Sequence, residues 1–172
     1  DNMKAVVLVA GEGSRMMPLT YTRHKSMIPL ANKPLLAHLL ERLPKSVDGV
    51  VLIVGHEQEG IRKFFGKKYS GKRIEYVEQK NPRGTGDAFL KAKKNVKGKF
   101  LGLVGDNLWS RQDFENIIKN HQGEVAVAGQ KVSDPTGLGV LVTRGSKLQK
   151  IVEKPQKPAG KLINTGLYLF ET

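Results

Sequence analysis

The stretch KAVVLVAGEGSR, residues 4–15, passes from a short apolar run directly into a glycine-rich loop. The run at residues 4–9 is rich in β-branched residues and does not alternate with polar ones, which is typical of a strand buried on both faces. Gly11 and Gly13 allow a tight turn in which successive backbone N–H groups can hold an anion. The stretch therefore predicts a buried strand followed either by a phosphate-binding loop or by an ordinary strand-to-helix turn.

The loop matches neither common phosphate-binding template. A GxGxxG loop needs a third glycine that opens a helix, whereas Pro18 follows here, and a Walker loop needs Gly-Lys-Ser/Thr at its end. Arg15 and Lys25 lie in the segment between the first strand and the next helix, where they supply a guanidinium fork and an ammonium charge. At the carboxyl end of a parallel strand this segment would line the ligand crevice of an α/β sheet, so we favour polyphosphate binding.

Strand and helix patterns alternate along most of the chain. Further strands are predicted at residues 49–54, 73–77, 100–104 and 125–128. Helical spacing covers residues 35–43, 57–65 and 85–96, and another helix begins after Ser110, an N-cap with Asp113 three residues on. The last part has strand patterns at 139–142, 148–151 and 162–170 and no helix signal. This order predicts an α/β fold with a largely parallel sheet and a β-rich end.

Composition excludes several classes of protein. The chain has 172 residues, which predicts one domain, and no cysteine, which excludes a disulfide framework, a thiol nucleophile and a thiolate metal site. Its longest apolar runs are far shorter than the roughly 18 residues of a membrane-spanning helix. A structured motif follows the first strand where a signal peptide would have its cleavage site. We therefore expect a cytoplasmic protein without membrane contact.

The net charge of +13 indicates an anionic partner. Residues 62–99, here called the basic segment, hold 13 Lys and Arg against three acids, so +10 of the charge lies there. A solvated, lysine-rich face is the usual reading of such a run. A nucleic-acid-binding module is the alternative, because aromatic residues interleave with the cations, but their spacing equally suits core positions. Those aromatic residues are Phe64, Phe65, Tyr69 and Tyr76.

Several motifs, in order along the chain, resemble the signature of the sugar-1-phosphate nucleotidyltransferases. Residues 8–20 (LVAGEGSRMMPLT) and 25–30 (KSMIPL) resemble the family pattern G-x-G-[ST]-R-x-x-P-L-T followed by P-K-P-M-[LI]-P-[VI], with His24 and Ser26 in place of prolines. The later motifs are Gln79 with residues 84–86 (GTG), 105–108 (GDNL), 134–135 (DP) with 139–140 (GV), 152–155 (VEKP) and 163–166 (INTG). The resemblance spans essentially the whole chain.

The resemblance implies a fold and a reaction. The fold would be a Rossmann-like, three-layer α/β fold of the GT-A type, with a mostly parallel mixed sheet and a β-rich sugar-binding subregion. The reaction would transfer a nucleotidyl group from an NTP (UTP or dTTP) to glucose 1-phosphate or N-acetylglucosamine 1-phosphate, releasing pyrophosphate. The attacking phosphate oxygen is already anionic, so catalysis would consist of positioning and charge neutralisation. Mg²⁺ would be the cofactor.

On the nucleotide side, the resemblance implies that Arg15 grips the phosphates, that Lys25 sits against the α-phosphate and that Asp106 binds the metal. Gln79, with Gly84 and Thr85, would read the base, since an amide offers a donor and an acceptor to the imide edge of uracil or thymine. An ordinary polar loop with Thr85 as helix N-cap is compatible with that role. The full nucleotide-binding set is Leu8, Ala10, Gly11, Glu12, Gly13, Ser14, Gln79, Gly84 and Thr85.

On the sugar side, the resemblance implies that Glu153 accepts hydrogen bonds from sugar hydroxyls and that Lys154 neutralises the sugar phosphate. Asn164 would bind a hydroxyl or an N-acetyl group, and Gly139 would line the same site. Thr165 and Gly166 would shape the backbone. Residues 1–130 would form the nucleotide-binding part of a single domain, and 131–172 the sugar-phosphate-binding part.

In the family that the chain resembles, a second aspartate far downstream also binds the metal. We therefore expect the domain, residues 1–172, to be incomplete at its C-terminus and its activity to depend on that downstream segment. A regulatory subunit that keeps the fold without catalysis is a further alternative, against which the joint presence of Arg15, Lys25 and Asp106 argues. Nucleic acid is the less favoured partner, and homo-oligomerisation stays open.

Overall fold

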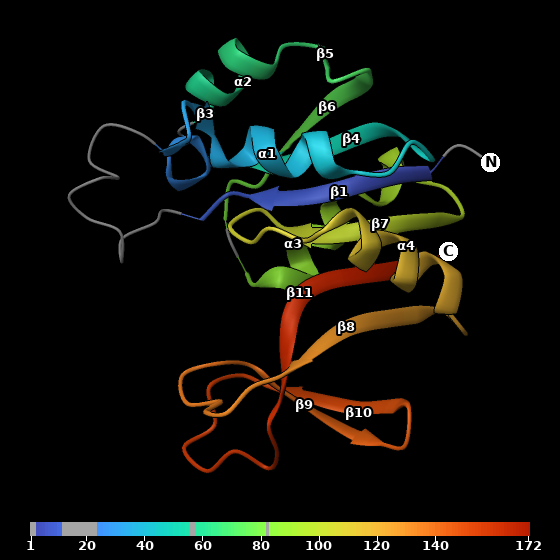
Figure 1. Cartoon of the computed structure of the whole chain (residues 1–172). Helices are drawn as coiled ribbons and strands as arrows, with labels where there is room; N and C mark the ends of the chain where they lie inside the picture. Colours follow the sequence, from blue (N-terminus) through green and yellow to red (C-terminus); the bar gives the residue numbers. More distant parts are fainter. Residues whose placement is uncertain (1–2, 12–23, 56–57, 82) are drawn as a thin grey trace.

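A nine-stranded sheet forms the centre of the molecule (Figure 1). The computed structural model describes residues 3–11, 24–55, 58–81 and 83–172. Within these ranges the strand order is β10-β9-β11-β7-β1-β4-β6-β5, and β8 pairs with β11. A separate two-stranded ribbon joins β2 (Pro29–Leu30) and β3 (Lys33–Pro34). The expected α/β fold with a mostly parallel sheet is confirmed, since four central strands run parallel.

The parallel part of the sheet is built around β1 (Met3–Val9). This strand pairs with β4 (Val47–Val54) on one side and with β7 (Lys99–Val104) on the other, and β4 in turn pairs with β6 (Lys72–Glu78). Both faces of β1 and β4 are covered, which explains their unbroken apolar runs. Parallel strands end at one edge, so the residues after β1, β6 and β7 meet there.

Helices cover both faces of this sheet, which gives the three layers expected. On one face, α1 (Leu35–Arg42), α2 (Glu59–Phe65) and α4 (Arg111–Asn120) belong to the larger core cluster. On the other face, α3 (Thr85–Lys91) packs Phe89 against a second cluster that includes Val6 and Ile53. Ser110 and Asp113 form the predicted capping box at the start of α4.

The predicted helix at residues 85–96 is too long. The α-helix ends at Lys91, and Lys93–Asn95 forms a 3-10 turn, η3. The N–H of Ala92 bonds the carbonyl of Phe89, three residues back, so the helix tightens there. Ala92 and Val96 are nonetheless buried, as the apolar spacing predicted.

The β-rich end grows out of the sheet through one long strand. β11 (Leu162–Glu171) pairs antiparallel with β7 through Leu167–Glu171 and with β8 (Val125–Lys131) along most of its length. Near its start it meets β9 (Val140–Arg144), which forms a hairpin with β10 (Lys147–Val152). Figure 1 shows this hairpin projecting below the parallel sheet. The short β5 (Lys68–Tyr69) closes the opposite edge.

Candidate active site

A 3-10 turn, η2 (Lys25–Met27), carries Lys25 to the carboxyl edge of the parallel strands. His24 is its N-cap: the Nδ1 atom accepts a hydrogen bond from the N–H of Ser26 at 3.2 Å and lies 2.7 Å from the Ser26 hydroxyl. His24 and Ser26 are the two residues that stand where the family pattern has prolines. Their mutual contact gives this short segment a hydrogen-bonded conformation of its own.

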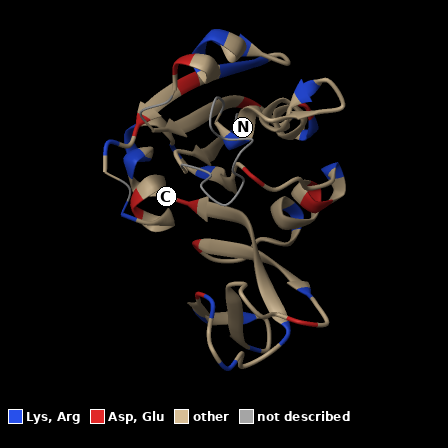
Figure 2. Ribbon diagram, turned by 90° about the vertical axis from the view of Figure 1, so that its left-hand side faces the viewer, with Lys and Arg blue, Asp and Glu red and all other residues tan. Residues whose placement is uncertain are grey.

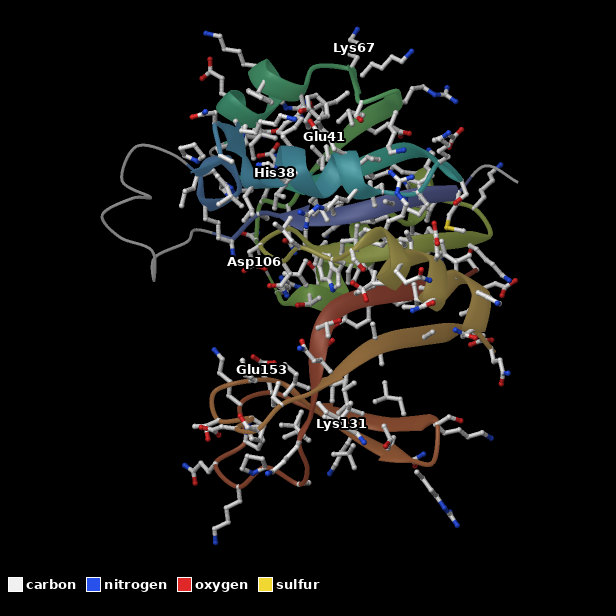
Figure 3. The ribbon with its side chains drawn as sticks, in the orientation of Figure 1. His38, Glu41, Lys67, Asp106, Lys131 and Glu153 are labelled. Carbon is white, nitrogen blue, oxygen red and sulfur yellow. The ribbon has the colours of Figure 1, made fainter. Side chains whose placement is uncertain are left out.

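Lys25 and Asp106 form an ion pair at this edge. The Nζ of Lys25 donates to Oδ2 of Asp106 at 2.7 Å, and the two side chains are 22% and 38% exposed. Asp106 follows β7 in a turn that is tied to β1, because the N–H of Gly105 bonds the carbonyl of Leu8 at 2.9 Å. Figure 3 shows Asp106 near the end of β1. Two residues predicted from separate motifs therefore meet in space.

The start of the glycine-rich loop adjoins this pair. A Cβ atom placed on Gly11 would lie 3.5 Å from Nζ and Cε of Lys25, so the backbone of Gly11 is next to the ammonium group. Leu8 and Ala10 precede it: the carbonyl of Leu8 accepts the bond from Gly105, and the backbone of Ala10 lies against Gly55. The rest of the predicted phosphate-binding set lies outside the described residues: Glu12, Gly13, Ser14 and Arg15.

Gln79 lies directly after β6 and is only 4% exposed. Its backbone N–H bonds the carbonyl of Val54 at 2.8 Å, which extends the β4–β6 pairing by one residue. Its side-chain Nε2 donates to Oδ2 of Asp87 at 2.9 Å. Because Asp87 lies in the first turn of α3, this bond joins Gln79 to the helix that begins with Thr85.

Gly84, not Thr85, is the N-cap of α3, so that part of the sequence prediction is wrong. Gly84 has φ +99°, a conformation that favours glycine, and no side chain caps the helix. Sequence reasoning also missed Asp87. The available signal was an acidic residue in the first helical turn, opposite a glutamine at a strand end. Next to Gln79 an open cavity of about 330 Å³ is lined by Glu78, Lys80, Asn81, Arg83, Asp87 and Lys91.

The sugar-side residues Gly139, Glu153 and Asn164 converge where β9, β10 and β11 meet. The N–H of Asn164 bonds the carbonyl of Gly139 at 2.8 Å. A Cβ on Gly139 would lie 2.9 Å from Oε2 of Glu153, so the carboxylate packs closely against the backbone of this glycine. Lys154 follows with φ +42° and is exposed. Figure 3 places Glu153 in the lower part of the molecule, away from Asp106.

The side chain of Asn164 is held by the protein itself. Its Nδ2 donates to the hydroxyl of Tyr168 at 2.5 Å, and its Oδ1 accepts from the N–H of Gly166 at 3.0 Å. The pairing of β11 with β8 shifts register between Asn164 and Tyr168, and Gly166 has φ +77°. This register shift is a β-bulge. Tyr168 was not predicted as a partner of Asn164, because no sequence pattern near it indicates a contact across such a bulge.

A short set of contacts connects this bulge to the turn that carries Asp106. The Nδ2 of Asn107 donates to the carbonyl of Thr165 at 2.8 Å, and the hydroxyl of Thr165 donates to the carbonyl of Ala128 at 2.8 Å. A Cβ on Gly166 would lie 2.8 Å from Cγ2 of Val104, at the end of β7. Thr165 and Gly166 thus shape the backbone, as predicted. Asn107 is a further residue that the prediction missed.

The carboxylate of Asp106 suits a hard divalent cation. Mg²⁺ keeps several waters and takes one or two protein carboxylates beside substrate phosphates, so a single aspartate at this edge fits. Oδ2 of Asp106 already accepts from a cationic group, Lys25 Nζ. Over the described ranges, three or more His, Cys, Asp or Glu residues never gather closely enough to hold a metal by themselves. No helix in those ranges is long and apolar enough to cross a membrane.

Comparison with known proteins decides the family. Residues 4–172 match the family model described as "Nucleotidyl transferase". The chain belongs to the nucleotidyl transferase family. It is 38% identical to the bifunctional protein GlmU of Methanococcus vannielii, over 98% of this chain and 41% of that protein. It is 30% identical to the UTP–glucose-1-phosphate uridylyltransferase AglF of Haloferax volcanii, over 98% of this chain and 72% of that one.

The fold of this family member is also that of a solved structure. A UDP-glucose pyrophosphorylase complexed with UDP-glucose superposes with a TM-score of 0.80, over 99% of this chain and 76% of that one, at 22% identity. That likeness concerns the fold alone. The chain spans about two fifths of the GlmU relative's length.

Proposed function

We propose that this chain serves in an enzyme that transfers a nucleotidyl group from UTP or dTTP to glucose 1-phosphate or N-acetylglucosamine 1-phosphate. The bond between the sugar phosphate oxygen and the α-phosphorus forms as the bond from that phosphorus to the β-phosphate oxygen breaks. Pyrophosphate leaves. The observation that carries the proposal is the Lys25–Asp106 pair beside Gly11 at the carboxyl edge of the parallel strands.

Lys25 would act on the transferred phosphate. An ammonium group at the end of β1 can neutralise charge that develops on the α-phosphate oxygens as the incoming oxygen approaches. Its present bond to Asp106 holds it at the edge where a nucleotide would lie. Arg15 and the backbone of the glycine-rich loop would bind the β- and γ-phosphates, as the sequence predicts.

Asp106 would hold Mg²⁺, with the remaining positions taken by water and nucleotide phosphates. When bound, the ion supplies Lewis-acid stabilisation of the phosphate charge. Lys25 would then contribute a fixed cation and Asp106 a metal ligand at the same edge of the sheet. No protein base is required, because the attacking phosphate oxygen is already ionised.

We further propose that residues 1–130 bind the nucleotide and that residues 131–172 bind the sugar phosphate. Support comes from two separate regions: the Lys25–Asp106 pair and the Gln79–Asp87 bond follow parallel strands, whereas Glu153 and Asn164 lie around Gly139. The contact from Asn107 to Thr165 links them, so substrate bound in either region could be positioned relative to the other. The name of the AglF relative, a UTP–glucose-1-phosphate uridylyltransferase, agrees with sugar-nucleotide chemistry.

The direct test is a substrate panel. Pyrophosphate release is measured for each of UTP, dTTP, CTP, ATP and GTP with each sugar 1-phosphate in Mg²⁺, and nucleotide binding is measured by calorimetry in parallel. We expect this chain to bind UTP or dTTP, and we expect pyrophosphate release with a matching sugar 1-phosphate in a longer chain that also carries the downstream aspartate. Failure to bind any of the nucleotides would refute the proposal. Nucleotide binding without turnover in that longer chain would instead favour the catalytically silent, regulatory alternative.

A further inference from the structure

The amide group of Gln79 is fixed in orientation by a carboxylate. Gln79 is 4% exposed, its backbone is bonded to β4, and its Nε2 lies 2.9 Å from Oδ2 of Asp87. Asp87 itself is half-buried and belongs to the first turn of α3. Asp87 therefore lies in a helix, and Gln79, directly after β6, has its backbone held by its hydrogen bond to β4.

The chemistry of the pair leaves one orientation for the amide. An ionised carboxylate accepts hydrogen bonds and donates none, so only the NH₂ end of Gln79 can face Asp87. Oε1 must then point away from Asp87, accompanied by the second amide hydrogen. Among the residues that the structure describes, none donates a hydrogen bond to this Oε1. An acceptor of fixed direction is thus left for a ligand.

We propose that Asp87 is a specificity-determining, positioning residue that makes the site select uracil and thymine over cytosine. Uracil and thymine carry an N–H at ring position 3, which can donate to Oε1 of Gln79. Cytosine has an acceptor at the same position, so two acceptors would oppose each other. The inference rests on the proposed function, in which Gln79 reads the base.

Replacement of Asp87 by asparagine removes this constraint with little change in shape. Asparagine can accept from Nε2 of Gln79 or, turned around, donate to its Oε1. Gln79 can then present its NH₂ group to cytosine. A site that hydrogen-bonds its ligand discriminates strongly against a ligand that leaves the bond unmade. We expect a preference for UTP over CTP of about tenfold or more, falling to about threefold or less in Asp87→Asn, mainly because CTP binds better.

The test measures dissociation constants of UTP and CTP, by calorimetry in Mg²⁺, for the unmodified chain, Asp87→Asn and Asp87→Ala. Asp87→Ala also frees Gln79, so it serves if Asp87→Asn does not fold. Asp48→Asn is the matched control, because it removes one aspartate at the amino end of β4, away from the site. A fall of the UTP-to-CTP ratio in the Asp87 variants and not in the control supports the proposal.

Other outcomes overturn it in distinguishable ways. If the Asp87 variants weaken UTP and CTP equally, Asp87 has a structural role only. If the unmodified chain binds UTP and CTP equally well, Gln79 does not discriminate, although the proposed function stands. If the unmodified chain binds no nucleotide at all, both the inference and the proposed function fail.

Discussion

At the scale of single residues, the predicted site divides into residues marked by local motifs and residues that act through space. Lys25 and Asp106 belong to separate motifs 81 positions apart, and the structure joins them at 2.7 Å. Asp87 and Tyr168 carry no motif of their own, because each acts by fixing the side chain of another polar residue. Sequence reasoning finds residues of the first kind and misses those of the second.

A glycine-to-alanine change tests the sugar side at this scale. In Gly139→Ala the new Cβ would lie 2.9 Å from Oε2 of Glu153, a flexible side-chain end that can move away. We therefore expect a fold that is retained, with a melting temperature within about 3 °C of the unmodified chain, and weaker sugar 1-phosphate binding, by about tenfold. Differential scanning calorimetry and binding titrations check both expectations.

Gly160→Ala is the matched control, since its Cβ would meet nothing within 4 Å. Equal sugar-phosphate affinity of the two variants would remove Glu153 from the proposed site. A collapse of stability in Gly139→Ala would show that the carboxylate cannot move aside as the geometry indicates.

At the scale of elements, the order of strands and helices could be predicted, but the contacts between elements could not. β1, β4 and β7 were expected from their apolar runs, because a strand covered on both faces needs no alternation. The bulge in β11 has no comparable signal: it depends on Gly166 lying against Val104, which only the assembled sheet reveals. The early end of α3 is a similar local tightening.

One contact between elements makes the free energy of unfolding fall as the pH rises through the alkaline range. The hydroxyl of Tyr69, in β5, donates to Oε1 of Glu41, in α1, at 2.9 Å, and Lys33 bonds the same carboxylate. Burial, together with the bond to Glu41, raises the pKa of Tyr69 to about 12. The unfolded chain would lose this proton near pH 10. The contribution of Tyr69 to the free energy of unfolding is therefore complete below about pH 10 and is lost as the pH rises toward 12.

Urea unfolding at pH 8 and pH 11 measures this effect by comparing the unmodified chain with Tyr69→Phe. Other groups titrate in both proteins, so the difference between them isolates Tyr69. We expect the unmodified chain to lose about 1 kcal/mol more of its unfolding free energy than the variant over this interval. The same loss in both proteins would contradict the contact's contribution.

At the scale of the whole molecule, the net charge of +13 separates into site cations and the basic segment. Figure 2 shows Lys and Arg gathered over α2 at the top of the view. Beside it an open cavity of about 640 Å³ is bordered by Arg62, Lys67, Arg73 and Tyr76, among others. The guanidinium of Arg62 lies 4.4 Å from the centre of the Tyr76 ring, so one face of that ring is occupied.

Three aromatic residues of the basic segment, Phe65, Tyr69 and Tyr76, lie in or against the core, which favours core positions over base stacking for them, whereas Phe64 is 47% exposed. Phe65 is 1% exposed and packs edge-on against Phe64 and Tyr69. We therefore expect only weak, non-specific attraction of the basic segment for nucleic acid. A labelled single-stranded oligonucleotide should bind at low salt and be released as salt is raised toward about 0.15 M, because counterion release drives such binding. Tight binding that survives this salt concentration would revive the nucleic-acid-binding alternative.

The proposed nucleotide site depends most on Lys25, which lies between Gly11 and Asp106. The measurement that addresses this directly is the dissociation constant of UTP in Mg²⁺ for the unmodified chain and for Lys25→Ala, with Lys147→Ala, in the projecting hairpin, as the control. We expect the unmodified chain and the control to bind UTP alike and Lys25→Ala to bind it about tenfold or more weakly. Equal affinities in all three proteins, or no binding by any of them, would contradict this expectation.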